Sequence, residues 1–351
     1  MADMSLIENS NGWFFDTGPE SDVVISSRVR LSRNLSGHFF PSVMSSDEES
    51  HVQYEVLDAF SADEMLHDDY RILYLRDLSP TERRMLLEEN LISQDYSMKP
   101  DRALILKNDR HGALLINDVD HLRFSSIHGG LSLDAAYEDV DAFESRMENG
   151  LDFAVSLDWG YLNTELSNIG TGLRASVMLH LPAVDFLSLS DKVMKTVMES
   201  GYSVKGFFSD DENSMGSIYQ MANQVGLGLS EQDILKNLAD TAIKVVNYER
   251  KAREEIIGRQ RVDIEDRVFR AYGILRYCKS ISTKEAIELL AALRLGVSGG
   301  LIDLPIEKLT ALMFLVQKSH IQKIIGGDED GADEQLINYT RAKVIQEVVN
   351  G

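Results

Sequence analysis

Two arginines separated by one residue follow an apolar stretch near the start of the chain. They are Arg28 and Arg30, within residues 26–33, and residues 22–25 precede them. If this run is a strand, both arginines share one face and Val29 points to the other. Two planar guanidinium groups side by side suit a phosphate chain, because each can donate two hydrogen bonds in a fixed geometry. A solvated strand edge, with arginines paired to surplus acidic residues, is an equally open alternative for this segment.

A second candidate segment combines glycines with an arginine. Residues 168–181 contain Gly-Thr-Gly-Leu-Arg-Ala at 170–175, which imitates a dinucleotide-binding fingerprint. That fingerprint needs a preceding strand, and residues 161–165 form a poor one. We favour a glycine loop that leads into a strand whose exposed face carries Arg174, with Ser176, Met178 and His180 on the same side. No Gly-x-x-x-x-Gly-Lys-Ser/Thr loop occurs in the sequence, which excludes the usual P-loop.

A third segment brings acidic and basic residues together at 117–123. It contains Asp118, Asp120, His121 and Arg123 just after an apolar run. Taken alone, such a segment is more often a loop held by local hydrogen bonds than an active site. The three histidines between 111 and 128 have neither cysteine neighbours nor the spacing of a zinc helix, so we predict no metal site built from protein ligands.

Composition limits the classes of function. The chain has 351 residues, 44% of them hydrophobic, and a formal net charge of −22. Collagen, coiled coil and disorder are excluded, and nucleic acid is not expected as a partner, because the surface is acidic as a whole. The single Cys278 favours a reducing compartment. Because we find neither a signal-like start nor a run of membrane-spanning length, we expect a cytoplasmic protein without a membrane partner.

The elements that position these residues fall into two groups. Up to about residue 225, short apolar runs such as 103–106 and 113–116 alternate with helical stretches, which predicts an α+β domain. After Ser230, helical periodicity dominates, with predicted helices from about 230, 264, 282 and 305 and a last short one near the end. We therefore expect a domain at 1–228 and an all-α domain at 229–351.

Together, these segments resemble the ATP:guanidino phosphotransferase family. The resemblance extends through residues 205–208, 216–224 and 267–275 and covers nearly the whole length. Within the family, the chain is most similar to the bacterial protein-arginine kinases of the McsB type, which lack a separate N-terminal helical domain. The resemblance implies a catalytic domain with an antiparallel sheet flanked by helices, followed by a C-terminal helical domain.

The resemblance also implies a nucleotide site. In the family, arginines hold the phosphates of ATP while Mg²⁺ bridges them, and positioning supplies most of the acceleration. Carried over residue by residue, the implied ATP-binding positions are Ser26, Ser27, Arg28, Val29, Arg30, Arg123, Arg174, Ala175, Ser176, Val177, Met178, Lys205, Gly206, Phe207, Phe208, Ser209 and Asp210.

The acceptor side departs from the family pattern. The catalytic glutamate of the family falls on Val119, between Asp118 and Asp120, and the active-site cysteine falls on Glu165. A second glutamate falls on Asn213. A guanidinium acceptor needs a nearby anion to bind it and direct its proton. Glu165 is therefore the candidate substitute anion, with Asp118 and Asp120 as further catalytic candidates. An inactive site in which Glu165 only balances the arginines is equally open.

Two further positions of the nucleotide half also differ. The histidine that lies near the adenine in the family falls on Asn90, and the family arginine at 205 is a lysine. Residues 210–212 are acidic and could replace the carboxylate missing at Asn213. In the helical domain, the phosphoarginine-sensing motif of the McsB type keeps only Arg341 and Ala342, so self-regulation by phosphoarginine is not expected.

Three functions follow from the resemblance. The first is an enzyme that phosphorylates arginine side chains of proteins, and the second is a nucleotide-binding pseudokinase that acts as a scaffold. The third, a kinase for small guanidines, is disfavoured because the N-terminal helical domain is absent. Expected partners are protein acceptors, a second copy bound through the helical domain, and, as a further candidate, an accessory activator protein.

Overall fold

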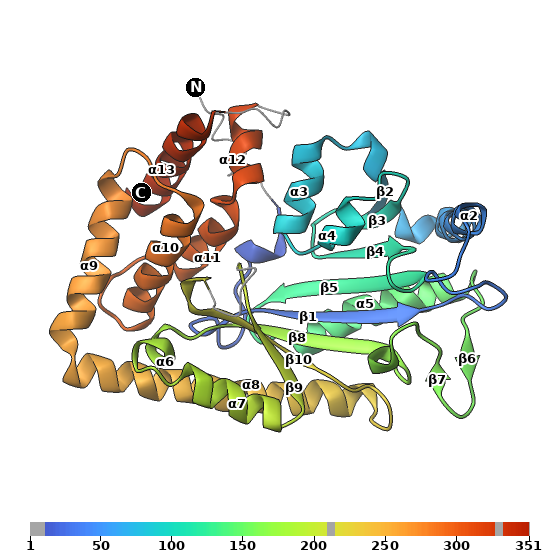
Figure 1. Ribbon diagram of the computed structural model, residues 1–351, viewed down its shortest axis with the longest axis horizontal. Helices are drawn as coiled ribbons and strands as arrows, with labels where there is room; N and C mark the ends of the chain where they lie inside the picture. Colours follow the sequence, from blue (N-terminus) through green and yellow to red (C-terminus); the bar gives the residue numbers. More distant parts are fainter. Residues whose placement is uncertain (1–10, 209–214, 327–332, 351) are drawn as a thin grey trace.

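An antiparallel sheet forms the centre of the protein in the computed structural model, which describes residues 11–208, 215–326 and 333–350 (Figure 1). The sheet has eight strands in the order β2-β3-β4-β5-β1-β8-β10-β9. These strands are β1 (Val24–Arg33), β2 (Tyr70–Tyr74), β3 (Ala103–Lys107), β4 (Gly112–Ile116), β5 (Leu122–Gly129), β8 (Leu173–His180), β9 (Tyr202–Gly206) and β10 (Ile218–Asn223). A separate hairpin pairs β6 (Val155–Ser156) with β7 (Gly160–Tyr161).

Helices flank the sheet and form a C-terminal group, as predicted. Those of the first part are α2 (Ser46–Ala62), α3 (Pro80–Glu88), α4 (Gln94–Ser97), α5 (Leu133–Glu148), α6 (Pro182–Phe186) and α7 (Ser190–Glu199). Those of the second part are α8 (Glu231–Arg259), α9 (Arg261–Tyr277), α10 (Thr283–Ser298), α11 (Ile306–Leu315), α12 (Lys318–Ile325) and α13 (Glu334–Asn350). Short 3-10 turns are η1 (Trp13–Phe15), η2 (Glu64–Leu66), η3 (Leu75–Asp77), η4 (Leu166–Asn168) and η5 (Met215–Ser217).

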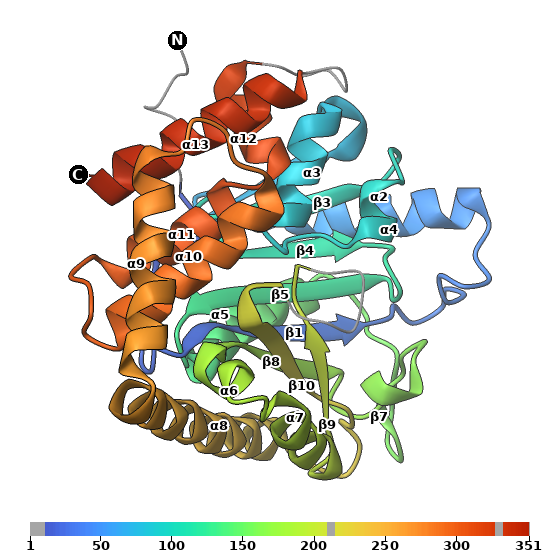
Figure 2. The same cartoon turned by 60° about the vertical axis from the view of Figure 1, so that its left-hand side comes forward.

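One face of the sheet is fully covered. Val29 of β1, Phe124 of β5 and Val177 of β8 are buried in one apolar cluster that also contains α5 and α8 residues. In both views, α8 runs beneath the sheet along its length (Figures 1 and 2). The apolar residues of α8 repeat at helical spacing, and Ser230 caps its start by accepting a hydrogen bond from the Asp233 amide. This helix, which the sequence placed in the second domain, therefore packs with the sheet; the division at 228 stays a prediction.

The opposite face is covered only in part. Met178 and Ile218, at one end of the sheet, lie in a second apolar cluster with residues of η1, α3, α10 and α11. The expected exposed face of β8 is therefore wrong from Ser176 onwards: Ser176, Met178 and His180 are 2%, 4% and 1% exposed. Local alternation predicts which side chains share a face, but not that a distant helical group covers it. The uncovered middle of this face carries Arg28, Arg30 and Arg174.

The helical group has two features beyond the predictions. The helix α12 was not predicted, although Gly326 ends it with a left-handed φ of 79°, a conformation that favours glycine. The last helix, α13, extends over 17 residues instead of being short. Ser282 caps α10 as predicted, by accepting a hydrogen bond from the Glu285 amide. Among the described helices, none is long and apolar enough to cross a membrane.

A buried arginine joins the helical group to the sheet. Arg294 of α10 is 1% exposed, and its Nη1 donates to Nδ1 of His180 at 2.9 Å and to the Asp22 carbonyl at 3.3 Å. Its Nε donates to the Thr310 hydroxyl at 3.2 Å, and its Nη2 donates to the Ser21 carbonyl. One side chain thus connects α10 and α11 with β8 and the segment before β1.

Removal of this side chain should destabilise the fold. In Arg294→Met, the buried acceptors at Ser21, Asp22 and His180 lose a charged donor, so the free energy of unfolding should fall by about 2–4 kcal/mol. Urea denaturation followed by circular dichroism measures this change in the free energy of unfolding. Arg270→Met, at an exposed arginine of α9, is the matched control and should change stability by less than about 0.5 kcal/mol. Equal effects of the two substitutions would contradict the role of Arg294.

Candidate active site

Four arginines from three adjacent strands lie on the uncovered face of the sheet. Arg30 of β1 is directly opposite Arg174 of β8, and Ser32 of β1 is opposite Arg123 of β5. Arg28 is two residues from Arg30 and on the same face. Because β1 lies between β5 and β8, the alternative of a solvated strand edge for this segment is wrong. The three segments that the sequence singled out thus meet at one place.

The electrostatics of this cluster indicate an anion site. In the part of the chain that the structure describes, the buried Nε atoms of Arg28, Arg30 and Arg123 have no hydrogen-bond partner. Burial, followed by the nearby charge of Arg123, lowers the pKa of Arg28 to about 9, and burial with the charge of Arg28 lowers the pKa of Arg30 well below its ordinary value. Asp118 forms an ion pair with Arg123. Like charges gathered with so little compensation favour binding of a polyanion.

A lysine on the edge strand adds a fifth cation. Lys205 of β9 is opposite Gln220 of β10, whose side-chain amide donates to the Ser176 hydroxyl at 3.1 Å. Partial burial and the charges of Arg30, Arg28 and Arg174 lower the pKa of Lys205. It therefore lies within electrostatic reach of the arginines.

The residues that follow Lys205 join the apolar cluster that covers one end of this face. After Gly206, the rings of Phe207 and Phe208 pack near Phe314 of α11, with centroids 6.5 and 5.5 Å from it. Ser209 and Asp210, and the nearby acidic residues 211–212 with Asn213, lie outside the described residues.

A pocket of about 350 Å³ opens beside the arginines. Its lining includes Arg30, Arg123 and Arg174 together with Val119 and Glu165. Val119 lies in the β4–β5 connection, and Glu165 lies just before η4, so distant parts of the chain meet here. The side chain of Glu165 is exposed. The pocket thus combines a cationic wall with one carboxylate and one exposed valine.

Asp120 holds the backbone before Glu165 instead of facing the pocket. Its side chain is 1% exposed, and its Oδ1 accepts from Asn34 Nδ2 at 2.9 Å and from the Thr164 amide at 2.7 Å. The neighbouring His121 is also buried, and its Nδ1 accepts from the Leu35 amide at 2.9 Å. Asp120 therefore fixes the residue before Glu165, while Asp118 remains engaged with Arg123.

A narrow cavity at Arg28 contains one residue, Trp13, that the sequence did not indicate, beside others that the resemblance implied. Trp13 of η1 lines it with Asn90, Ser26 and Met178. The Trp13 ring is 1% exposed, and its Nε1 donates to the Glu89 carbonyl at 2.9 Å. Asn90 has a φ of 61°, and its buried Nδ2 has no hydrogen-bond partner among the described residues. Nothing near Trp13 in the sequence indicated this position.

The remaining positions implied by the resemblance point away from this face. Val29, Ala175 and Val177 are buried in the cluster on the other side of the sheet. The Ser27 hydroxyl donates to the Gly130 carbonyl at 2.9 Å and accepts from the Ser132 amide. The side chains of these four residues support the strands and do not line either pocket.

The segment that carries Trp13 is attached to the sheet by a histidine. His111 Nε2 lies 2.5 Å from an Asp16 carboxylate oxygen, and its Nδ1 lies 3.3 Å from a carboxylate oxygen of Asp109. Burial alone would lower the pKa of His111, but the hydrogen bonds to Asp109 and Asp16 outweigh it and raise the pKa to about 10.

This attachment predicts a pH dependence of stability. Because the folded-state pKa of His111 exceeds the unfolded value of about 6.5, its contribution is complete below that pH and is lost as the pH rises towards 10. Thermal melts at several pH values should show His111→Gln destabilised at low pH, with the difference from the wild type shrinking towards pH 10. His51→Gln, on the exposed side of α2, should show a constant difference. A constant difference for His111→Gln would refute the ion pair.

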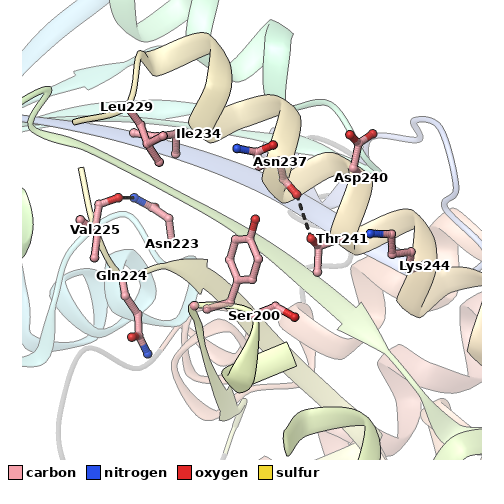
Figure 3. A pocket seen from close by; sticks show the side chains of 12 residues that line it. Ser200, Asn223, Gln224, Val225, Leu229, Ile234, Asn237, Asp240, Thr241 and Lys244 are labelled. Atoms are coloured by element: carbon pink, nitrogen blue, oxygen red, sulfur yellow. Dashed lines mark hydrogen bonds between the residues drawn. The ribbon is translucent and has the colours of Figure 1, made fainter. Parts of the chain in front are cut away.

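A larger pocket, of about 480 Å³, lies on the opposite face of the sheet. It runs between the ends of β9 and β10 and the helix α8, as Figure 3 shows. Tyr202 and Asn223 are among the residues that line it, and Asp240 and Lys244 are its charged residues. With one cation and one anion, it is poorly suited to a polyphosphate, and the sheet separates it from the arginines.

The remnant of the phosphoarginine-sensing motif has a structural role. Arg341 of α13 is 0% exposed, and it donates from Nε to the Val316 carbonyl at 2.6 Å and from Nη1 to the Ile281 carbonyl at 2.8 Å. These bonds connect α13 with the end of α11 and with the loop between α9 and α10. An arginine used in this way is not available to an external ligand.

Comparisons with known proteins agree with this geometry. Residues 51–252 match the family "ATP:guanido phosphotransferase, C-terminal catalytic domain", and residues 261–351 match "Protein-arginine kinase McsB C-terminal domain". The protein-arginine kinase of Moorella thermoacetica is 36% identical, with 99% of this chain and 100% of that protein covered. That of Bacillus subtilis is 35% identical, with 90% and 88% covered.

Solved structures share the fold. A duplicated taurocyamine kinase from Schistosoma mansoni has a TM-score of 0.60 at 24% identity and covers 67% of this chain and 34% of that chain. Lombricine kinase has a TM-score of 0.57 at 21% identity, with 71% and 70% covered. The predicted resemblance and the predicted α+β fold, with an antiparallel sheet and a helical C-terminal region, are confirmed.

Proposed function

Since this chain belongs to the ATP:guanido phosphotransferase family, we propose that it phosphorylates arginine side chains of proteins with ATP. The P–O bond between the γ-phosphoryl group and ADP breaks, and ADP is the leaving group. A P–N bond forms to the acceptor guanidinium, which releases one proton. The relatives named protein-arginine kinase, and the match of residues 261–351, support proteins as acceptors over small guanidines.

The proposal assigns the phosphates to the arginine cluster. The proposed phosphate ligands are the guanidinium groups of Arg28, Arg30, Arg123 and Arg174, each of which can donate two hydrogen bonds. The unpartnered Nε atoms of the first three fit additional phosphate oxygens. The narrow cavity with Trp13 and Asn90 adjoins Arg28, but its volume of about 10 Å³ holds little more than one water molecule, so the proposal assigns no nucleobase site to it. Among the described residues there is no group of three or more metal-binding side chains. We therefore infer that Mg²⁺ enters with the nucleotide, bound mainly to phosphate oxygens and water.

The observation that carries the proposal is the placement of Glu165 in the arginine-lined pocket. A carboxylate there can bind the acceptor guanidinium and direct its proton, while the cationic wall neutralises charge on the transferred group. Asp120 supports this role through its bond to the Thr164 amide, which fixes the backbone next to Glu165. Asp120 is thus a positioning residue in this proposal.

A pseudokinase is the second candidate, and Val119 favours it. This side chain is 39% exposed and lines the same pocket, at the position where the family has its catalytic glutamate. Valine can neither bind a cation nor accept a proton. In that case the arginines hold a nucleotide without transfer, and Glu165 only offsets their charge.

Transfer of label from γ-³²P-ATP to an arginine-rich protein distinguishes the two candidates. Phosphoarginine is acid-labile, so label that is lost in acid and retained in base supports the enzyme. Nucleotide binding by calorimetry together with undetectable transfer supports the pseudokinase. Absence of both would refute the assignment of the arginine cluster, and transfer to free arginine alone would favour a small-guanidine kinase.

The homodimer also remains a proposal. Val262, Phe269 and Tyr277 of α9, with Leu336 and Tyr339 of α13, are large apolar side chains with 44–77% exposure. Such a surface on two packed helices supports association through the helical region. The accessory activator protein has no specific support in the described residues.

A further inference from the structure

The β6–β7 hairpin presents apolar side chains to solvent. Val155, Leu157 and Trp159 are 63%, 108% and 56% exposed, and Leu166 of η4 is 85% exposed. Figure 1 shows this hairpin at the end of the molecule away from the helical group, where no labelled helix covers it. Single exposed apolar residues are ordinary, but four within twelve positions form a patch of the kind that marks an interaction site.

The base of this hairpin is fixed by buried contacts. Phe153 is 6% exposed and is bridged to Leu35, two residues after β1 ends. The guanidinium of Arg33 lies 3.5 Å above the Tyr161 ring and forms an ion pair with Glu144 at 2.7 Å. The exposed tip therefore projects from an ordered base. Because the backbone is already fixed, binding through the apolar side chains of the tip costs little conformational entropy.

The hairpin is continuous with the pocket that contains Glu165. Tyr161 is bridged to Gly170, which closes the short loop that carries Glu165 and Leu166. Leu166 is seven positions after Trp159, so the two lie at most about 25 Å apart. One extended acceptor segment can therefore contact the tip while its arginine reaches Glu165.

The negative charge of the hairpin region favours a partner that carries a positive charge. Between Arg146 and Arg174 the sequence contains Glu148, Asp152, Asp158 and Glu165 and no Lys, Arg or His. Asp152 and Asp158 are exposed beside the apolar tip. An apolar patch within a purely acidic segment is complementary to a chain in which apolar residues flank an arginine.

We propose that the β6–β7 hairpin, with Leu166, is a docking surface for acceptor polypeptides that carry apolar residues within about seven positions of the target arginine. This rests on the proposed function, because it assigns the class of acceptor for the same pocket. Leu157 and Trp159 bind the apolar residues, while Asp158 and Glu165 attract the guanidinium. Substrate choice then depends on local sequence and on exposure of apolar segments.

Peptide binding without ATP tests this surface. We would compare two labelled peptides of about 12 residues, each with one arginine, flanked either by Leu and Phe or by Ser. The apolar peptide should bind more tightly by about tenfold and shift the fluorescence of Trp159 to the blue; the other tryptophan, Trp13, is already buried. Leu157→Asp should remove that preference. Tyr248→Asp, at a 59% exposed residue of α8, is the matched control and should leave it unchanged.

The outcomes separate docking from catalysis. If neither peptide is phosphorylated but binding still depends on Leu157, the proposed function fails and the docking surface stands. Equal binding of both peptides, or an intact preference in Leu157→Asp, refutes the docking surface even if transfer is observed. If light scattering shows that Leu157→Asp turns a dimer into a monomer without changing peptide binding, the patch is occupied by a second copy and the proposal is wrong.

Discussion

Arg30→Met is expected to weaken magnesium-nucleotide binding by about 10- to 100-fold while leaving the free protein as stable as the wild type or more stable. The loss follows from the charge-assisted, bidentate contacts that one guanidinium makes to phosphate, worth about 1.5–3 kcal/mol. The retained stability follows from the position of Arg30 between Arg28 and Arg174, where removal of a cation relieves repulsion. Methionine keeps the length and apolar packing of the stem.

Titration calorimetry with magnesium ADP and thermal melts with and without nucleotide measure both effects. Arg270→Met, at an arginine 72% exposed on α9, is the control and should bind nucleotide normally. A cluster used only for structure would behave in the opposite way, with Arg30→Met destabilised in the absence of nucleotide. Unchanged nucleotide affinity would place the phosphates elsewhere, and the proposed function would lose its basis.

Local sequence was sufficient to predict which side chains share a face of a strand and where helices begin. The alternation in β1 correctly placed Arg28 and Arg30 on one side, because side-chain direction in a strand depends only on position. The start of α8 at Ser230 was equally local. Each depends on neighbours within four residues and needs no knowledge of the rest of the chain.

The pairing of strands that are distant in the sequence could not be predicted from local sequence. That Arg174 lies opposite Arg30 depends on β8 pairing with β1 across about 140 residues of sequence, which no periodicity predicts. The burial of His180 depends on Arg294, a residue of the distant helix α10. Trp13 was missed for the same reason, because its role depends on a cavity whose other walls come from β1, β5, β8, β10 and the turn after α3. Only the resemblance to a family brought the arginines together before the structure did.

Glu165→Gln should lower the rate of phosphoryl transfer by about 10²- to 10⁴-fold while nucleotide affinity stays within about twofold of the wild type. Glutamine fills the same space but cannot accept a proton or neutralise the acceptor cation. Since Glu165 is exposed at the pocket, the substitution should leave the melting temperature unchanged. Single-turnover transfer to an arginine-containing peptide measures the rate. Glu148→Gln, on the same acidic segment but at the end of α5, is the matched control.

Val119→Glu then tests whether a carboxylate at position 119 can replace the function of the Glu165 carboxylate in the same pocket. Val119 is exposed and lines the same pocket, so a longer side chain fits without displacing the core. In the Glu165→Gln background, Val119→Glu should recover a substantial part of the lost rate, because either position places an anion against the acceptor guanidinium. If the wild type is inactive and Val119→Glu alone confers transfer, the chain is a pseudokinase inactivated at one position. If neither carboxylate affects transfer by an active wild type, the acceptor is bound outside this pocket, and the role assigned to Glu165 is wrong.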